Sequence, residues 1–343
     1  MKLSPPPQVD LFLDSLINVP LKDERVTMEL PFFSLSKRPR LDPIEYSDGG
    51  VRIRVESGPR GLATIWDKDV LIYCASLIND RIERGAVIDR TVRIAAHDLL
   101  RVCQRGTGKA AYQRLYEALT RLRATTILTN VAAGGRAEER GFGWIDDFRA
   151  IRNCDGLMLA LEITLSRWVL EAIAADRRVL TIDRGYFCLT KGIERRLYEL
   201  ARKHCGHQPR WVISLPRLAA KCGTSRDVRR FKADLKAIVA ADTLPDYLVG
   251  MTFDPADRKQ IEEALGADAG RRYRSNHRII VVFTPRRAPV EESASSGYGS
   301  RTIADDEART IADGNADYHG RGDGRSRTRR GRNNMIRQRE SDP

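Results

Sequence analysis

Basic side chains crowd into one short stretch of the chain, residues 225–236. They are Arg226, Arg229, Arg230, Lys232 and Lys236, and the hydroxyl of Ser225 comes directly before them. Ammonium and guanidinium groups bind phosphate, and a guanidinium also forms paired hydrogen bonds with the edge of guanine. The stretch therefore has the chemistry for DNA contact. An ordinary surface helix with a solvated basic face is the alternative interpretation.

An apolar stripe accompanies these charges. Val228, Phe231, Leu235 and Ile238 recur at spacings of three and four, which predicts a helix with one buried face. The basic residues fall mostly off that stripe. The helix would therefore pack on one side and present its cations on the other.

A tight turn is predicted between this helix and a shorter one over residues 216–221. Cys222 and Gly223 supply the turn, because glycine tolerates the left-handed conformation that a turn needs. Thr224 or Ser225 is then expected to cap the second helix. Two helices joined in this way form a helix-turn-helix, in which the second helix reads DNA.

The same pattern occurs earlier, in residues 97–126. The aligned pairs are Leu99 with Leu218, Cys103 with Cys222, Tyr112 with Phe231, Tyr116 with Leu235 and Leu119 with Ile238, each 119 residues apart (218 − 99 = 119). A constant offset over five apolar or cysteine positions indicates two copies of one small domain. In the first copy we assign Lys109 and Arg114 to DNA contact.

The elements around each copy predict its fold. The first copy should contain a helix over residues 64–84, a strand over 87–94, the helix-turn-helix, and a wing of two strands over 125–132 and 143–152. A hairpin over residues 44–55 precedes it. A strand over residues 157–165 and a helix opened by Ser166 should connect it to the second copy.

The second copy follows the same order. It should contain a helix over residues 190–205, a strand over 211–214, the helix-turn-helix, and strands over 247–253 and 277–284. Arg272, Arg274 and His277 lie on or beside its wing, where we expect contact with the DNA backbone or minor groove. The predicted fold class is α+β, with tandem winged-helix domains.

The termini differ in composition from these two copies. We expect a flexible N-terminal segment over residues 1–28, with a helix packed on the chain's own first domain as the alternative. Winged-helix domains are expected over 29–165 and 166–285, and a disordered basic tail over 286–343. Residues 318–339 carry eight Arg and one Asp, which favours nonspecific DNA binding, with a dispensable solubilising tail as the alternative. Near the start of the first domain, the basic cluster of Lys37, Arg38 and Arg40 is either a phosphate contact or a solvated loop.

The overall composition is compatible with this interpretation. The 343 residues include 59 Lys plus Arg against 46 Asp plus Glu, a net charge of +13, which favours a polyanionic partner. No apolar run approaches the ~20 residues of a membrane span, and the proline-rich, acid-bearing start predicts no export signal. The six cysteines form no Cys-x-x-Cys pair, so we expect reduced, mostly buried thiols in a cytoplasm.

Several catalytic motifs are incomplete. GTGK at residues 106–109 resembles the end of a phosphate-binding loop, but Cys103 and Ala110 replace the residues that the motif needs. His204, Cys205 and His207 are too cramped for a zinc site and have no second ligand pair. No His-hydrophobe-His motif of a nuclease occurs. We therefore predict no catalytic residue, no metal, no cofactor and no enzymatic activity.

Four runs carry a family resemblance. They are LPFFSLSKRPR at 30–40, WDKDVLIYCASLIND at 66–80, YQRLYEALTRL at 112–122 and GWIDDF at 143–148. Together with the order of elements up to about residue 285, they resemble the plasmid replication initiator protein A (RepA) family. The resemblance implies a protein that binds repeated sequences (iterons) in the double-stranded DNA of an origin, promotes duplex opening and recruits host replication initiation and helicase proteins.

The resemblance also implies roles for the two copies. In related initiators the C-terminal copy reads the iteron in the major groove, which points to Arg226, Arg229, Arg230 and Lys232, and the N-terminal copy supports a homodimer and further DNA contact. The implied location is the bacterial cytoplasm, in association with nucleoid or plasmid and not with a membrane. A winged-helix transcriptional regulator is the alternative, because the same fold would serve it. The two differ in their targets: an initiator prefers direct repeats, whereas a dimeric repressor prefers a palindrome.

Overall fold

The computed structural model describes residue 16 and residues 19–131, 139–174, 179–206, 208–253 and 279–286. All of these lie in one compact unit, Met1–Val290. Within the described ranges, every helix is too short or too polar to traverse a bilayer.

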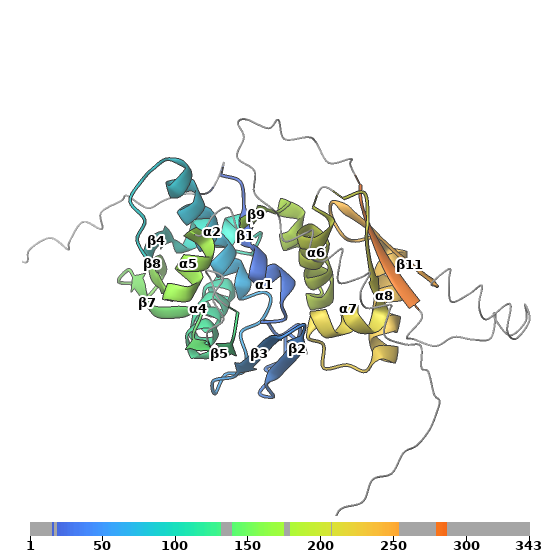
Figure 1. Ribbon diagram of the computed structural model, residues 1–343. Helices are drawn as coiled ribbons and strands as arrows, with labels where there is room; N and C mark the ends of the chain where they lie inside the picture. The colour runs from blue at the N-terminus through green and yellow to red at the C-terminus, as the bar shows by residue number, and fades with distance from the viewer. Residues whose placement is uncertain are drawn as a thin grey trace, which may run out of the picture. The chain divides into compact units, whose positions relative to one another are not determined.

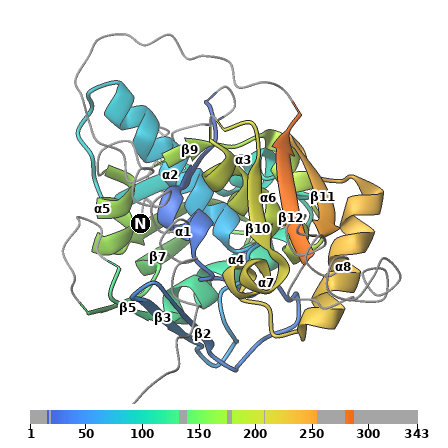
Figure 2. The same ribbon diagram turned by 45° about the vertical axis from the view of Figure 1, so that its right-hand side comes forward.

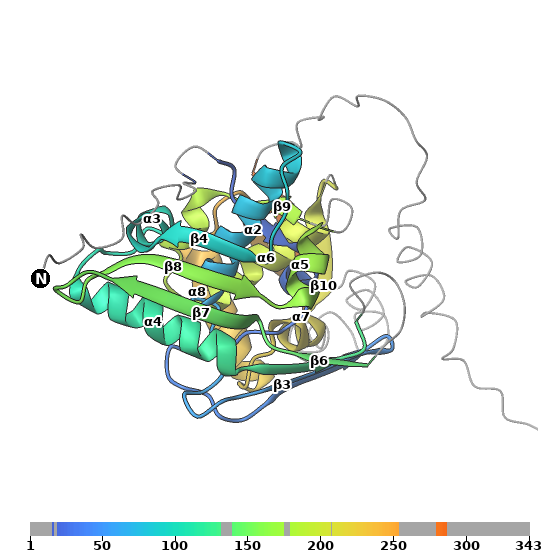
Figure 3. The same ribbon diagram turned by 90° about the vertical axis from the view of Figure 1, so that its left-hand side faces the viewer.

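The first copy of the repeat is built from three helices and a three-stranded antiparallel sheet. Its elements, in chain order, are α2 (Lys68–Glu83), β4 (Thr91–Ala95), α3 (Ala96–Val102), α4 (Lys109–Ala124), β7 (Ile145–Arg152) and β8 (Met158–Leu165). The strands lie in the order β4-β8-β7, and α4 runs along this sheet (Figure 3). Leu115, Leu119 and Leu122 are fully buried, because their spacing places them on one face of α4.

The second copy repeats this arrangement. Its elements are α6 (Gly192–Cys205), β10 (Trp211–Ser214), α7 (Leu215–Cys222), α8 (Val228–Ala241), β11 (Tyr247–Phe253) and β12 (Ile279–Pro285). The strand order is β10-β12-β11, and α7 and α8 lie beside the sheet (Figure 2). Helix α8 begins 119 residues after α4 (228 − 109 = 119), so the predicted offset between the copies is confirmed.

The turn between α7 and α8 has the predicted glycine and an unpredicted cap. Gly223 is left-handed at φ 62°, as expected. The cap is Asp227, whose side chain accepts a hydrogen bond from the Arg230 N–H at 2.9 Å. The prediction that Thr224 or Ser225 caps the helix was wrong. These residues lie in a further turn before α8, in which the Thr224 hydroxyl accepts a hydrogen bond from the Arg226 N–H.

The predicted wing of the first copy was also wrong. Strand β5 (Thr126–Thr129) does not pair with β7 but lies between β3 (Val51–Glu56) and β6 (Arg140–Phe142). Strand β7 pairs instead with β8, the strand that was expected to be a connection. The two are joined by a turn whose Gly156 has φ 76°, so Asp155-Gly156 is the hairpin signal that identifies the true pair.

A four-stranded sheet, ordered β2-β3-β5-β6, adjoins the first copy. Its hairpin of β2 (Ile44–Asp48) and β3 confirms the pairing predicted from the turn between them. Figure 1 shows β2 and β3 beside α7. The Arg217 guanidinium of α7 forms an ion pair of 3.3 Å with Asp48 at the end of β2, so this hairpin contacts the second copy.

The last part of the predicted flexible lead is regular structure. Strand β1 (Lys22–Glu24) pairs with β9 (Val179–Thr181), and α1 (Arg25–Glu29) follows directly. The Glu24 side chain caps α1 by accepting from the N–H groups of Val26 and Thr27. Because β9 lies in the connection between the copies, the segment from Lys22 ties that connection to the start of the chain. The connection also holds α5 (Arg167–Ala174) and a short 3-10 helix (Arg184–Cys188).

Buried charges join the first helices of the two copies. The Lys68 ammonium of α2 lies 2.7 Å from Asp23 and 2.9 Å from Glu199 of α6. Next to it, Asp69 of α2 pairs with Arg195 of α6 at 2.6 Å. These side chains are at most 4% exposed, so each charge depends on its partners for the solvation that it has lost.

Candidate nucleic-acid interface

The exposed side of α8 carries cations along its length. Arg229, Arg230 and Lys236 are exposed, whereas Phe231 and Leu235 are fully buried. The Arg230 side chain is 78% exposed. The α8 sequence thus separates into a face that packs on the domain and a face that is free to meet an anion.

The start of α8 is held by Asp227. Its pKa is lowered first by the hydrogen bond from the Arg230 N–H and further by the neighbouring arginines. The carboxylate therefore stays charged beside the helix N-terminus, where a negative group is favoured. This cap sets the direction in which Arg229 and Arg230 leave the first turn.

The other residues of this region that were predicted to contact DNA differ in exposure and in ion pairing. Arg226 lies before α8 and forms an ion pair of 2.7 Å with Asp234, yet its side chain remains 58% exposed. Ser225 is exposed in the turn, and Lys232 is half-buried. Arg226 can reach a ligand only by sharing its guanidinium with Asp234, or by leaving it.

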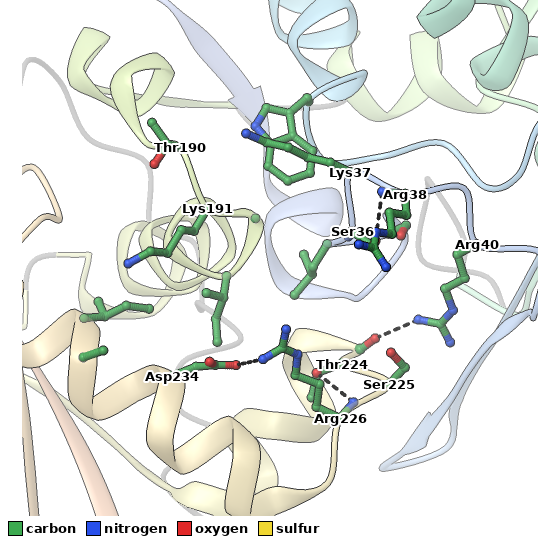
Figure 4. Close-up of a pocket in the computed structure, with 18 residues that line it drawn as sticks. Ser36, Lys37, Arg38, Arg40, Thr190, Lys191, Thr224, Ser225, Arg226 and Asp234 are labelled. Atoms are coloured by element: carbon green, nitrogen blue, oxygen red, sulfur yellow. Dashed lines mark hydrogen bonds and ion pairs between the residues drawn. The ribbon is translucent and has the colours of Figure 1, made fainter.

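A basic pocket adjoins the start of α8. It has a volume of about 940 Å³, and its lining includes five basic residues against one acidic residue, Asp234. The basic residues are Lys37, Arg38, Arg40, Lys191 and Arg226. Figure 4 shows that they come from segments far apart in sequence: the loop of residues 36–40, the start of α6 and the turn before α8.

Arg40 ties the loop of residues 36–40 to the helix-turn-helix. Its guanidinium donates to the Gly223 carbonyl at 3.2 Å and to the Pro43 carbonyl at 3.0 Å, as the dashed line in Figure 4 illustrates for the first of these bonds. Gly223 itself sits so close to Pro31 that a Cβ atom at this position would lie 2.6 Å from the proline Cβ. The turn of the second copy is thereby held against the segment that precedes the first copy.

A second basic pocket, of about 410 Å³, lies by the first copy. Its lining has five basic residues, Lys37, Arg60, Arg105, Arg114 and Arg121, against Asp67 and Glu117. Arg121 holds Asp67 with two hydrogen bonds of 2.7 and 2.8 Å, so that acid is neutralised. Lys109 is exposed at the first residue of α4 but does not line this pocket.

The two pockets share Lys37 and Trp66. Ser225 and Arg226 of the second copy line one pocket, and Arg114 of the first copy lines the other. The structure thus gathers predicted residues from both copies around one loop. The remaining predicted residues on the wing, Arg272, Arg274 and His277, lie outside the described residues.

Sequence reasoning missed Arg60, Trp66 and Lys191. The basic cluster at residues 37–40 did indicate part of the pocket lining from the sequence. No local pattern marks Trp66, because its spacing is that of an ordinary buried position of the following helix. Across the residues that the structure describes, no three His, Cys, Asp or Glu side chains are grouped so as to hold a metal ion.

Three comparisons connect this chain to known proteins. The family model described as "Replication initiator protein A" matches residues 22–249. A protein of Wigglesworthia glossinidia brevipalpis named "Putative replication protein" is 34% identical over 231 residues, which cover 66% of this chain and 83% of that protein.

A solved structure has a similar fold. It is titled "Crystal structure of SeMet derivatives of domain2 and domain 3 of RctB", and it matches with a TM-score of 0.51 at 11% identity, covering 75% of this chain and 95% of that one. At this identity the likeness concerns the fold alone.

Proposed function

The chain belongs to the replication initiator protein A family, and from this premise we propose that it starts plasmid replication by binding repeated sequences (iterons) in the duplex DNA of an origin. The observation that carries the DNA-binding part is the row of exposed cations on α8, Arg229, Arg230 and Lys236. In the proposal this helix enters the major groove. No catalytic step is required of the chain itself.

Each copy of the repeat is proposed to be a winged-helix domain. The order helix, strand, helix, helix, strand, strand and the placing of the last strand at the centre of each sheet support this assignment. In such domains the helix after the turn is the one presented to DNA. That helix is α8 in the second copy and α4 in the first.

The cations in and before α8 are proposed to make two kinds of contact, with bases and with phosphates. Arg229 and Arg230, at its N-terminal turn, read base edges, because the first turn of a recognition helix is the part that enters the groove. Ser225, Arg226, Lys232 and Lys236 hold phosphates, which orient the helix without reading sequence. In the first copy, Lys109 and Arg114 add a further contact to the DNA.

The remaining steps of initiation extend the proposal to partners. Binding to several adjacent repeats would promote opening of the neighbouring duplex and recruit host replication initiation and helicase proteins in the bacterial cytoplasm. A homodimer through the first copy is part of the same proposal. These steps follow from the family's role, and no described surface identifies a particular host protein.

A footprint of the purified full chain on its own flanking DNA tests the function. Protection of direct repeats at intervals near the helical turn supports the initiator. A single protected palindrome over a promoter would instead indicate a transcriptional regulator, and the absence of specific protection would remove the DNA-reading role. Arg229→Ala with Arg230→Ala, compared with Arg123→Ala with Arg210→Ala, shows whether protection depends on α8 or on net charge.

A further inference from the structure

We propose that the two basic pockets around Trp66 form one groove that holds a single strand of DNA, with an unpaired base stacked on the indole of Trp66. This groove is defined by Trp66 together with Lys37, Arg38, Arg60 and Arg114. It deepens the proposed function, because an initiator that opens a duplex produces unpaired strands. Its ligand is distinct from the duplex assigned to α8, and the DNA contact proposed for Arg114 is to this single strand.

Trp66 occupies the junction of the groove. It is one of two residues that line both the pocket of about 940 Å³ and the pocket of about 410 Å³. The indole is partly exposed, although it lies in the turn just before α2, where its neighbours Ile65 and Asp67 are buried. A large aromatic side chain is therefore packed partly against the protein, with part of its surface lining both pockets.

A cation already lies over the Trp66 ring. The Lys37 ammonium is 5.1 Å from the ring centroid, in a cation–π contact. Lys37 is exposed and has no carboxylate partner among its contacts in the described part of the chain. The lysine can move aside to a phosphate while a base takes its place on the ring, where base–aromatic stacking would hold it.

Free cations flank the ring on both sides. Arg38 on the side of the larger pocket, and Arg60 and Arg114 on the side of the smaller one, are exposed, and within the described ranges none of their guanidinium groups pairs with a carboxylate. The acids nearby are engaged: Asp67 with Arg121, Asp234 with Arg226, and Glu117 with the amide of Gln113 at 3.1 Å. The groove therefore keeps a surplus of positive charge for a phosphate backbone.

The aromatic ring distinguishes a single strand from a duplex. In a duplex each base face is covered by its neighbours, so phosphates alone could meet this surface. An unpaired base exposes its face, and aromatic rings interleaved with cations are the arrangement by which proteins hold single strands without reading sequence. The cations alone would suit either form of DNA, and Trp66 is what favours the unpaired one.

The test measures binding of a labelled thymidine oligonucleotide to the full chain by fluorescence anisotropy. A random-sequence duplex of equal length and the origin fragment are the comparison probes. The variants are Trp66→Ala, Trp66→Phe and the pair Arg60→Glu with Arg114→Glu. The pair Arg123→Glu with Arg210→Glu is the control, because both arginines are exposed and line neither pocket.

We expect Trp66→Ala to weaken oligonucleotide binding about tenfold, in keeping with the loss of one stacked base. Trp66→Phe should keep most of the affinity. Reversing the charges of Arg60 and Arg114 should lower the affinity for the oligonucleotide more than the control pair does. Affinity for the origin fragment should stay within about twofold for Trp66→Ala. An oligonucleotide carrying 5-iodouracil should photo-crosslink to the peptide that contains Trp66.

Unchanged oligonucleotide binding in Trp66→Ala overturns the proposal, and so does an equal loss for single strand and duplex. If Trp66→Ala fails to fold, the reversed arginine pair decides, since both side chains are on the surface. The failure of the proposed function has a different signature: no footprint on the origin fragment and no effect of Arg229→Ala with Arg230→Ala. The oligonucleotide result stands in that case on its own.

Discussion

The Lys68 ammonium and the Glu199 carboxylate lie 2.9 Å apart, and both side chains are 1% exposed. Lys68 belongs to α2, the first helix of the first copy, and Glu199 to α6, the first helix of the second. Glu199 also accepts from the Tyr186 hydroxyl at 2.8 Å and from Arg196 at 3.0 Å. The two copies are thus joined by charges that water does not reach.

Lys68→Met should destabilise the protein strongly. The substitution leaves Asp23 and Glu199 facing each other without their shared cation, and breaking a buried ion pair in this way costs about 3–5 kcal/mol. Urea unfolding measures the loss. Lys22→Met is the control, because Lys22 pairs with Glu83 at 3.9 Å and that carboxylate side chain is 60% exposed. Equal losses in the two variants would contradict a special role for the buried pair.

Arg229→Ala with Arg230→Ala should lower specific DNA affinity without lowering stability. Both side chains are exposed, and a base-reading contact contributes about 1–3 kcal/mol, so we expect a loss of at least tenfold for the pair. Anisotropy with the origin fragment and with random duplex measures specific and nonspecific binding separately. A uniform loss on both probes would reassign these arginines from bases to phosphates.

Gly223→Ala should loosen the turn of the second helix-turn-helix. The residue has φ 62°, and the added Cβ would lie 2.6 Å from that of Pro31, so we expect a loss of more than about 1 kcal/mol in thermal or urea unfolding. Gly106→Ala is the matched control in the first copy, where a Cβ meets no atom within 4 Å. The idea fails if the two alanine variants are equally stable.

His204→Phe should flatten the pH dependence of stability. Burial lowers the pKa of His204 to about 3, and Lys221 and Lys203 add to the effect, while the ring stacks on Trp211 at 4.4 Å. The folded pKa lies below the ordinary value of 6.5, so the unfolded chain binds the proton first and stability is lost as the pH falls below 6.5.

Between pH 7 and pH 5 this loss amounts to about 2 kcal/mol for the native chain, at 1.36 kcal/mol per pH unit. His204→Phe keeps a stacking ring and cannot titrate. The free energy of unfolding in urea should therefore fall by about 2 kcal/mol less between pH 7 and pH 5 in this variant than in the native chain. His97→Phe is the control, because it replaces a histidine whose side chain is 52% exposed. If His204→Phe keeps the native pH dependence, the role given to His204 is wrong.

The helices of both copies follow from the sequence itself. Apolar spacings of three and four, a glycine at the turn and the offset of 119 residues are local or repeated features, and they predicted α3, α4, α7 and α8 together with the cations that α8 exposes. Periodicity reports which face of a helix is buried because that face repeats along a few turns. The family resemblance rested on four sequence runs between residues 30 and 148 and on the order of the elements.

Strand pairing and the groove around Trp66 were decided by the tertiary structure. A strand's pattern tells which face is buried but not which strand lies beside it. The predicted pairing of β5 with β7 is wrong for this reason, because β5 lies between β3 and β6. Likewise, Arg40 and Gly223 meet across 183 residues, and Lys68 and Glu199 across 131. Such contacts depend on how whole elements pack, and no short-range spacing records them.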